Sequence, residues 1–113
     1  MTAVLEDTFA ALADPTRRKV IDALKKEPLR AGELAELLEL SAPAMSRHLR
    51  VLRHSGLVEE NDLPHDARVR LYRLKPEAFV QLRDWLDEVQ AFWTDQLSAF
   101  AAHAEKTRGK KKK

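Results

Sequence analysis

Apolar residues recur every three or four positions through the first half of the chain, in four short stretches. That spacing places them on one side of a helix, so the pattern predicts helices over 3–13, 15–26, about 32–38 and 41–56. Because only a few residues separate the last two helices, they are expected to form a helix-turn-helix. The expected inward positions are Val4, Leu5, Phe9 and Leu12, then Val20, Ile21 and Leu24, then Leu34, Leu37 and Leu38, and finally Met45, Leu49 and Leu52.

The stretch 41–56 contains basic residues but no acidic residue. In a helical projection, Met45, Leu49 and Leu52 fall within roughly 60° of one another. Ser41 is placed to cap this helix by accepting a backbone N–H. The opposite side carries Arg47, Arg50 and His54. Two interpretations remain open for this side: a solvated basic surface, or a surface that contacts phosphates and base edges of a nucleic acid.

Residues 57–61 and 68–74 have the character of strands, because polar and apolar residues alternate in the second of them. Residues 63–67 are expected to form the loop between the strands. The resulting hairpin would be a wing, with Arg68 and Arg70 near its tip and free to reach a phosphate or a minor groove. The alternative is an ordinary sheet that covers the helices and leaves these arginines solvated.

A long helix is predicted from residue 77 to about residue 106, with apolar residues three or four positions apart. It is longer than the core of so small a domain, so a second copy of the chain is the simplest cover for its apolar side. The predicted interface combines Phe79, Leu82, Leu86, Val89, Trp93, Leu97 and Phe100 with Leu5, Phe9 and Leu12 of the first helix. The alternative is that the whole apolar side packs within its own subunit. We expect no cofactor between Trp85, Phe92 and Trp93, since aromatic residues at helical spacing usually belong to a core.

Together these elements predict a mainly α (α+β) fold, a winged helix-turn-helix followed by a long C-terminal dimerisation helix. Residues 1–105 are expected to form a single domain, and the basic segment 106–113 a disordered tail. The tail would either attract nucleic acid nonspecifically or serve only solubility.

Composition narrows the class of protein further. The chain has 113 residues, of which 44% are hydrophobic, enough for one core. It contains no cysteine, which excludes disulfides, thiolate metal ligands and a thiol nucleophile. The N-terminal residues do not resemble a signal peptide and no apolar run could span a membrane, so we expect a cytoplasmic protein with no membrane partner.

Charge is sorted along the chain, although the formal net charge is only +2. Residues 1–105 hold 14 Lys and Arg against 18 Asp and Glu, a net charge of −4, and residues 106–113 add six positive charges. Half of those 14 bases lie in segments 41–56 and 67–75, which contain no acid. This distribution favours contact with a nucleic acid at the helix and the hairpin.

Five short motifs, in this order, resemble the ArsR/SmtB family of winged helix-turn-helix repressors over about residues 5–104. They are FAALADPTRR (9–18), GELA (32–35), SRHLRVLR (46–53), SGLV (55–58) and YRL (72–74). The resemblance implies a dimer that pairs through its first and last helices and binds imperfect palindromes in double-stranded DNA. The residues that it implies for DNA contact are Ser41, Ala44, Ser46, Arg47, His48 and Arg50 on the helix, and Arg68 and Arg70 on the wing.

The chain departs from the metal-sensing members of that family. It lacks their cysteine motif, and on the last helix the residues two positions after Asp84 and Asp95 are leucines instead of histidines. His103 is followed by Lys106 where a second ligand would stand. The four histidines share no ligand spacing. We therefore expect no metal and no other cofactor.

Three departures concern turns. Glu39 stands where the family usually has Gly, Arg30 where a capping Ser or Thr is usual, and Ala67 where the wing often has Gly. If the backbone at Glu39 has a positive φ, that residue costs something like 1 kcal/mol.

These observations favour a homodimeric, sequence-specific, metal-independent repressor of its own or a neighbouring promoter. The alternative is a winged-helix module that binds proteins and has lost DNA binding. We expect no enzyme, because the sequence offers no catalytic triad, metal site or phosphate-binding loop. Release of the DNA could depend on an inducer near the dimer interface, on the protein's own concentration or on a partner protein.

Overall fold

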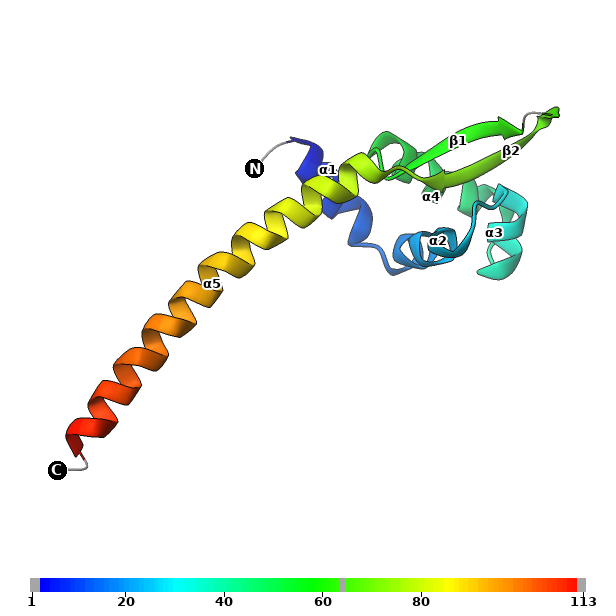
Figure 1. Ribbon diagram of the computed structural model, residues 1–113. Coiled ribbons are helices and arrows are strands. Elements are labelled where there is room, and N and C mark those ends of the chain that lie inside the picture. Colours follow the sequence, from blue (N-terminus) through cyan, green and yellow to red (C-terminus); the bar gives the residue numbers. More distant parts are fainter. Residues whose placement is uncertain (1–2, 64, 112–113) are drawn as a thin grey trace. The chain divides into compact units, whose positions relative to one another are not determined.

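The computed structural model describes residues 3–63 and 65–111, except for the side chains of residue 67 and of residues 107–111. Its elements are α1 (Ala3–Leu12), α2 (Pro15–Lys26), α3 (Ala31–Leu37), α4 (Ala42–His54), β1 (Val58–Leu63), β2 (Asp66–Leu74) and α5 (Pro76–Lys111) (Figure 1). This order confirms the predicted winged helix-turn-helix. The chain divides into two compact units, Met1–Leu82 and Arg83–Lys113, where the sequence predicts a single domain over 1–105.

Helix α2 begins at a side-chain cap and is tied to the helix before it. The carboxylate of Asp14 accepts two backbone N–H groups at the start of α2, at 2.8 and 3.1 Å. Arg17 Nε then donates to the carbonyl of Ala11 at 2.7 Å, and Arg18 Nη1 donates to the carbonyl of Leu12 at 2.7 Å. Because the last carbonyls of a helix lack partners within it, these two arginines complete the end of α1 and hold it against α2.

Both helices of the helix-turn-helix end in the same hydrogen-bonding pattern, the Schellman motif. After α3, the N–H groups of Glu39 and Leu40 donate to its second-last and third-last carbonyls, at 3.2 and 2.9 Å. After α4, Gly56 and Leu57 do the same, both at 3.0 Å. The motif needs a left-handed residue, and φ is 57° at Glu39 and 75° at Gly56. The turn between the helices therefore has the positive φ at which a residue other than glycine, here Glu39, strains the backbone.

Strands β1 and β2 form an antiparallel hairpin, with a register shift between Asp62 and Leu63. Pairing continues to Leu63 opposite Asp66, so the prediction of a loop over 63–67 was wrong at both ends. The Asp66 carboxylate helps to start β2, because it accepts the backbone N–H of Arg68 at 3.0 Å. In addition, the backbone groups of Leu29 bond to those of Tyr72 at 2.8 and 3.1 Å, which joins the α2–α3 connection to the wing.

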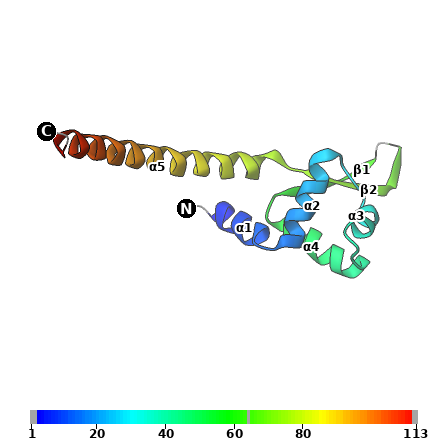
Figure 2. The same cartoon turned by 90° about the horizontal axis from the view of Figure 1, so that it is seen from below.

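The core of the first unit lies mainly between α2, α3, α4 and the hairpin, elements that Figure 2 shows from below, and Ala11 of α1 and Ala78 of α5 also belong to it. Nearly all the predicted inward residues of these helices belong to it. The fully buried large side chains include Val20, Leu34, Met45, Leu49, Leu52 and Leu57. Leu37 is an exception, since it is 61% exposed and the expectation that it faces the core was wrong. Ala35 takes the buried position instead, beside Leu34 on the same side of α3.

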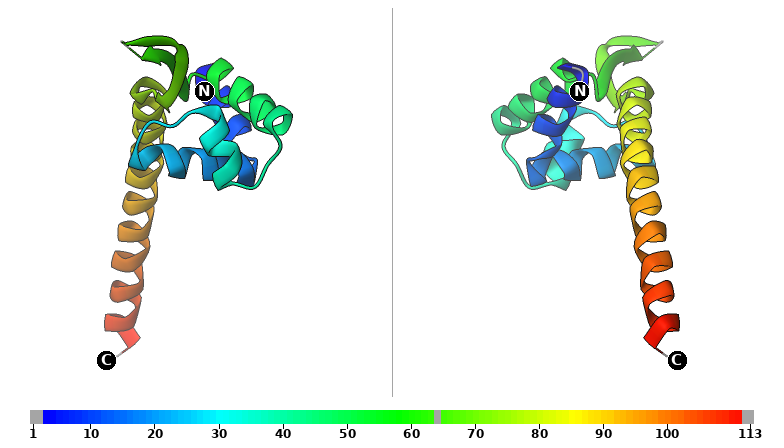
Figure 3. Two further views of the ribbon diagram at one scale, coloured as in Figure 1. Left: turned by 90° about the vertical axis from the view of Figure 1, so that its right-hand side faces the viewer. Right: turned by 90° about the vertical axis from the view of Figure 1, so that its left-hand side faces the viewer.

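Helix α5 is uninterrupted in Figure 3 and continues to Lys111, beyond the end near residue 106 that the sequence predicts. Residues 106–111, which were expected to be disordered, are thus helical, and residues 112–113 lie outside the described part of the chain. No helix among the described residues is long and apolar enough to cross a membrane.

The ten residues predicted for a dimer interface differ in exposure. Leu5 is buried, and Leu12 and Phe79 pack against the core of their own unit, so these three positions already have cover within one chain. Four positions of the second unit are exposed, at 49 to 72%. They are Leu86, Trp93, Leu97 and Phe100. The remaining three are half-buried, namely Phe9, Leu82 and Val89.

Candidate nucleic-acid interface

Helix α4 has one side in the core and one side in solvent, as the projection of its sequence predicts. Met45, Leu49 and Leu52 are at most 1% exposed. The helix starts at Ser41, whose hydroxyl oxygen accepts the N–H of Ala44 at 3.2 Å. Of the six helix residues implied in DNA contact, the structure leaves Ser41, Ser46, Arg47 and Arg50 exposed and half-buries Ala44 and His48.

Arg47 and Arg50 differ from Arg53, Arg68 and Arg70, whose side chains bind carboxylates. Within the part of the chain that the structure describes, neither has a hydrogen bond or an ion pair from its side chain to another residue. A guanidinium without an internal partner keeps its five donors for a phosphate or for the acceptor edge of guanine. The exposed side of α4 therefore offers two positive groups that are ready to bind.

The wing arginines are less free than the sequence suggests. Arg68 is 92% exposed but lies 3.3 Å from Asp66. Arg70 binds Glu60 at 2.9 Å and lies 3.6 Å from Asp62. The segment 67–75 contains no acid, but Asp66 at the start of β2 lies beside Arg68, and two acids of β1 lie beside Arg70.

Glu60 is the centre of this arrangement. Its carboxylate accepts hydrogen bonds from Arg53 at 3.0 Å, from Arg70 at 2.9 Å and from the Tyr72 hydroxyl at 3.2 Å. The hydrogen bond and the charge of Glu60 raise the pKa of Arg70 above its ordinary value. Burial, and then the same charge, raise the pKa of Tyr72, so its hydroxyl keeps the proton that it donates. We call these four side chains the Glu60 cluster.

The sequence contains a signal for this cluster, which lies in the pairing of the two strands and not in the acid-free segments. Glu60 pairs with Tyr72 across the hairpin, and Arg70 lies two positions from Tyr72 on the same strand. Side chains two positions apart on a strand share a face, so pairing the two predicted strands would have placed Glu60 beside Arg70. Counting charges along the chain does not show this, because the acid belongs to the other strand.

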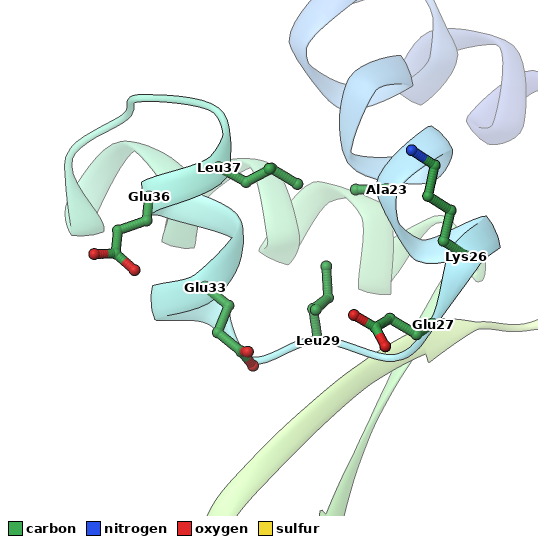
Figure 4. Close-up of a pocket in the computed structure, with 7 residues that line it drawn as sticks. All are labelled: Ala23, Lys26, Glu27, Leu29, Glu33, Glu36 and Leu37. Carbon is green, nitrogen blue, oxygen red and sulfur yellow. The ribbon is translucent and has the colours of Figure 1, made fainter.

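A second feature, a hollow of about 530 Å³ between α2 and α3, has the wrong charge for a phosphate (Figure 4). Three carboxylates and one ammonium group line it together with three apolar side chains. They are Glu27, Glu33, Glu36 and Lys26, with Ala23, Leu29 and Leu37. This hollow therefore lacks the positive charge that the exposed side of α4 carries. Among the described residues, no three His, Asp or Glu side chains gather as a metal ion would require.

A helix-turn-helix with an exposed basic second helix, followed by an antiparallel hairpin, defines a winged helix-turn-helix protein. Residues 14–60 match the family described as bacterial regulatory protein, arsR family. Over 93 residues the chain is 45% identical to the HTH-type transcriptional regulator Rv2034 of Mycobacterium tuberculosis, covering 82% of this chain and 81% of that protein. The chain belongs to the ArsR family.

Other relatives agree with this assignment. The transcriptional repressor SdpR of Bacillus subtilis is 37% identical over 57 residues, which cover 50% of this chain and 63% of that protein. An ArsR-like transcriptional regulator from Rhodococcus sp. RHA1 superposes with a TM-score of 0.72 at 32% identity, covering 87% of this chain and 90% of that structure. The family consists of DNA-binding transcriptional regulators, so the chain is a regulator and not an enzyme.

Proposed function

We propose that the chain is a homodimeric, metal-independent repressor that binds an imperfect palindrome in its own or a neighbouring promoter, in the cytoplasm. The observation that carries the proposal is the pair of unpartnered arginines on α4, Arg47 and Arg50. Each subunit would place them in a major groove, and the two half-sites would lie about one helical turn, roughly 34 Å, apart. The exposed wing residue Arg68 would contact the phosphate backbone of the DNA beside that groove.

Two further observations support the finer points of this proposal. Metal independence is supported by the absence of cysteine from the sequence. The homodimer is supported by large exposed apolar side chains on the second unit, since patches of this kind commonly mark interfaces. The alternative, a protein-binding module without DNA affinity, is opposed by the acid-free, unpartnered basic side of α4.

The test is a fluorescence-anisotropy titration with duplex DNA from the region upstream of the coding sequence. Arg47→Ala or Arg50→Ala should weaken specific binding by about 1–3 kcal/mol, because each removes a base or phosphate contact. Arg83→Ala is the matched control, since it removes the same charge from an exposed position on α5 that is outside the helix-turn-helix. It should bind like the wild type.

Three results would contradict the proposal. Equal affinity of the Arg50→Ala and Arg83→Ala variants would show that α4 is not the reading helix. Loss of DNA binding on addition of a chelator, or its appearance only with added zinc or nickel, would overturn metal independence. Failure of the wild type to bind this DNA at low salt would favour the protein-binding alternative.

A further inference from the structure

The Glu60 cluster joins three elements of the first unit through one carboxylate. Arg53 belongs to the last turn of α4, Glu60 to β1, and Arg70 and Tyr72 to β2. One oxygen of Glu60 accepts from Arg70, and the other accepts from both Arg53 and Tyr72. The carboxylate thus holds the end of the reading helix to the wing.

The exposure of these groups shows which of them can turn toward another partner. The Glu60 side chain is 13% exposed, whereas those of Arg53 and Arg70 are 49% and 65% exposed. The guanidinium groups therefore face solvent while their counterion stays sheltered between them. A carboxylate that accepts three hydrogen bonds in a sheltered place competes strongly with a DNA phosphate for these arginines.

The charges of the two clustered arginines are balanced by the carboxylates that bind them. Arg53 and Arg70 carry two positive charges, and Glu60 and Asp62 carry two negative charges within 3.6 Å of them. An arginine neutralised by a carboxylate releases few counterions when it approaches a phosphate, so it adds little to electrostatic attraction. Arg47 and Arg50 have no carboxylate partner among the described residues, so each would attract DNA more strongly than Arg53 or Arg70.

We propose that Glu60 is a specificity-determining residue, which withholds Arg53 and Arg70 from the phosphates of non-cognate DNA and keeps the wing fixed to the reading helix. This inference rests on the proposed function. Nonspecific binding depends almost entirely on phosphate contacts, whereas specific binding also uses base edges. Withholding two arginines from phosphates therefore weakens nonspecific binding by a larger fraction than it weakens specific binding. Fixing the wing to the reading helix also preserves the geometry that the specific contacts need.

The experiment compares Glu60→Gln with Glu59→Gln, by anisotropy titration of an upstream duplex and of an unrelated duplex of equal length at several salt concentrations. Glu59 is the matched control, because it lies on the same strand and its carboxylate binds Asn61 at 3.3 Å. Glu59 stands opposite Arg73 in the hairpin and lines the same hollow as Arg53 and Arg70, but no described arginine forms an ion pair with it. Both variants lose one negative charge per subunit, so only the position of that charge differs.

Glu60→Gln is expected to bind the unrelated duplex about fivefold or more tightly than Glu59→Gln at roughly 0.1 M salt, and to steepen the log–log salt dependence by about one phosphate per subunit. The ratio of specific to nonspecific affinity should fall. Glu60→Asp keeps the charge and should restore a salt dependence close to that of the wild type. A role in folding alone would lower the melting temperature of Glu60→Gln and leave the salt dependence unchanged.

Equal titrations for Glu60→Gln and Glu59→Gln would overturn the inference and leave the proposed function standing. If the wild type binds neither duplex, the proposed function and the inference fail together. Should Glu60→Gln not fold, Asp62→Asn offers a second variant at a well exposed side chain that also faces Arg70. Asp62→Asn should also have a steeper log–log salt dependence of DNA binding than Glu59→Gln. An equal salt dependence would overturn the inference.

Discussion

At the scale of single residues, the two turns that follow α3 and α4 use one hydrogen-bonding motif with different residues in its left-handed position. Gly56 has no Cβ and takes φ 75° without strain, whereas Glu39 has a Cβ that crowds the backbone at φ 57°. The turn inside the helix-turn-helix therefore carries backbone strain that the turn after α4 does not. Its hydrogen bonds are nevertheless complete, so the strain affects stability and not geometry.

Glu39→Gly should raise the free energy of unfolding by about 1 kcal/mol, because glycine removes the left-handed strain. Urea unfolding followed by circular dichroism measures the change. Gly56→Ala is the reciprocal variant, and nothing lies within 4 Å of the Cβ that it would add. It should lower stability by about 1 kcal/mol through backbone strain alone. A Glu39→Gly protein no more stable than the wild type would show that the turn is not strained.

Asp14 makes the stability of α2 depend on pH. Hydrogen bonds from the backbone of Arg17 and Thr16 lower the pKa of Asp14 below its ordinary value of 3.8. A lowered pKa means that the folded state favours the ionised carboxylate. Asp14 therefore stabilises the fold above pH 3.8, and that stabilisation is lost as the pH falls through its folded value.

Asp14→Asn should consequently have a lower melting temperature than the wild type at neutral pH. The difference in melting temperature should shrink as the pH is lowered past 3.8. Asparagine can still accept the capping hydrogen bonds but lacks the charge that favours a helix N-terminus. Thermal melts at a series of pH values measure this. Asp14→Ala removes the acceptor as well and should melt lowest at neutral pH. A difference between Asp14→Asn and the wild type that does not change with pH would contradict the role given to the charge.

At the scale of elements, α4 shows how far sequence reasoning reaches. Its apolar positions repeat at the helical period, Ser41 caps it and Gly56 ends it, so its bounds and its buried side could all be predicted. Each of these signals is local, because it depends on residues within one or two turns of one another. The candidate reading side of α4 could be named for the same reason.

The wing and α3 show where such reasoning stops. Strand ends depend on cross-strand pairing, and a register shift after Asp62 extended β1 and β2 into residues predicted to be a loop. Leu37 fits the helical period but lies on the side of α3 that faces the hollow beside α2 (Figure 4). The Glu60 cluster depends on which strand residues come together, and a charge count along one segment could not include the acid from the other strand.

At the scale of the whole molecule, the first unit has a hydrophobic core, whereas none of the side chains described in the second unit is fully buried. Trp93, Leu97 and Phe100 are 57%, 64% and 72% exposed in a single chain. Exposed side chains of this size, repeated at helical spacing, form a stripe that association with another apolar stripe would bury. The palindromic operator that we propose would also require two identical reading helices, so a second copy of this chain would satisfy both needs.

Leu97→Glu should therefore convert a dimer into a monomer, because it places a charge at the centre of the stripe, where burial without a partner is costly. Size-exclusion chromatography with light scattering measures the mass directly. Ser98→Glu adds the same charge at an exposed position about 100° further round the helix, and should remain dimeric. The monomeric variant should also lose most of its affinity for a two-half-site duplex, because each half-site would then be bound independently. A wild-type chain that elutes as a monomer, or a Leu97→Glu variant with the same mass as Ser98→Glu, would refute pairing through α5.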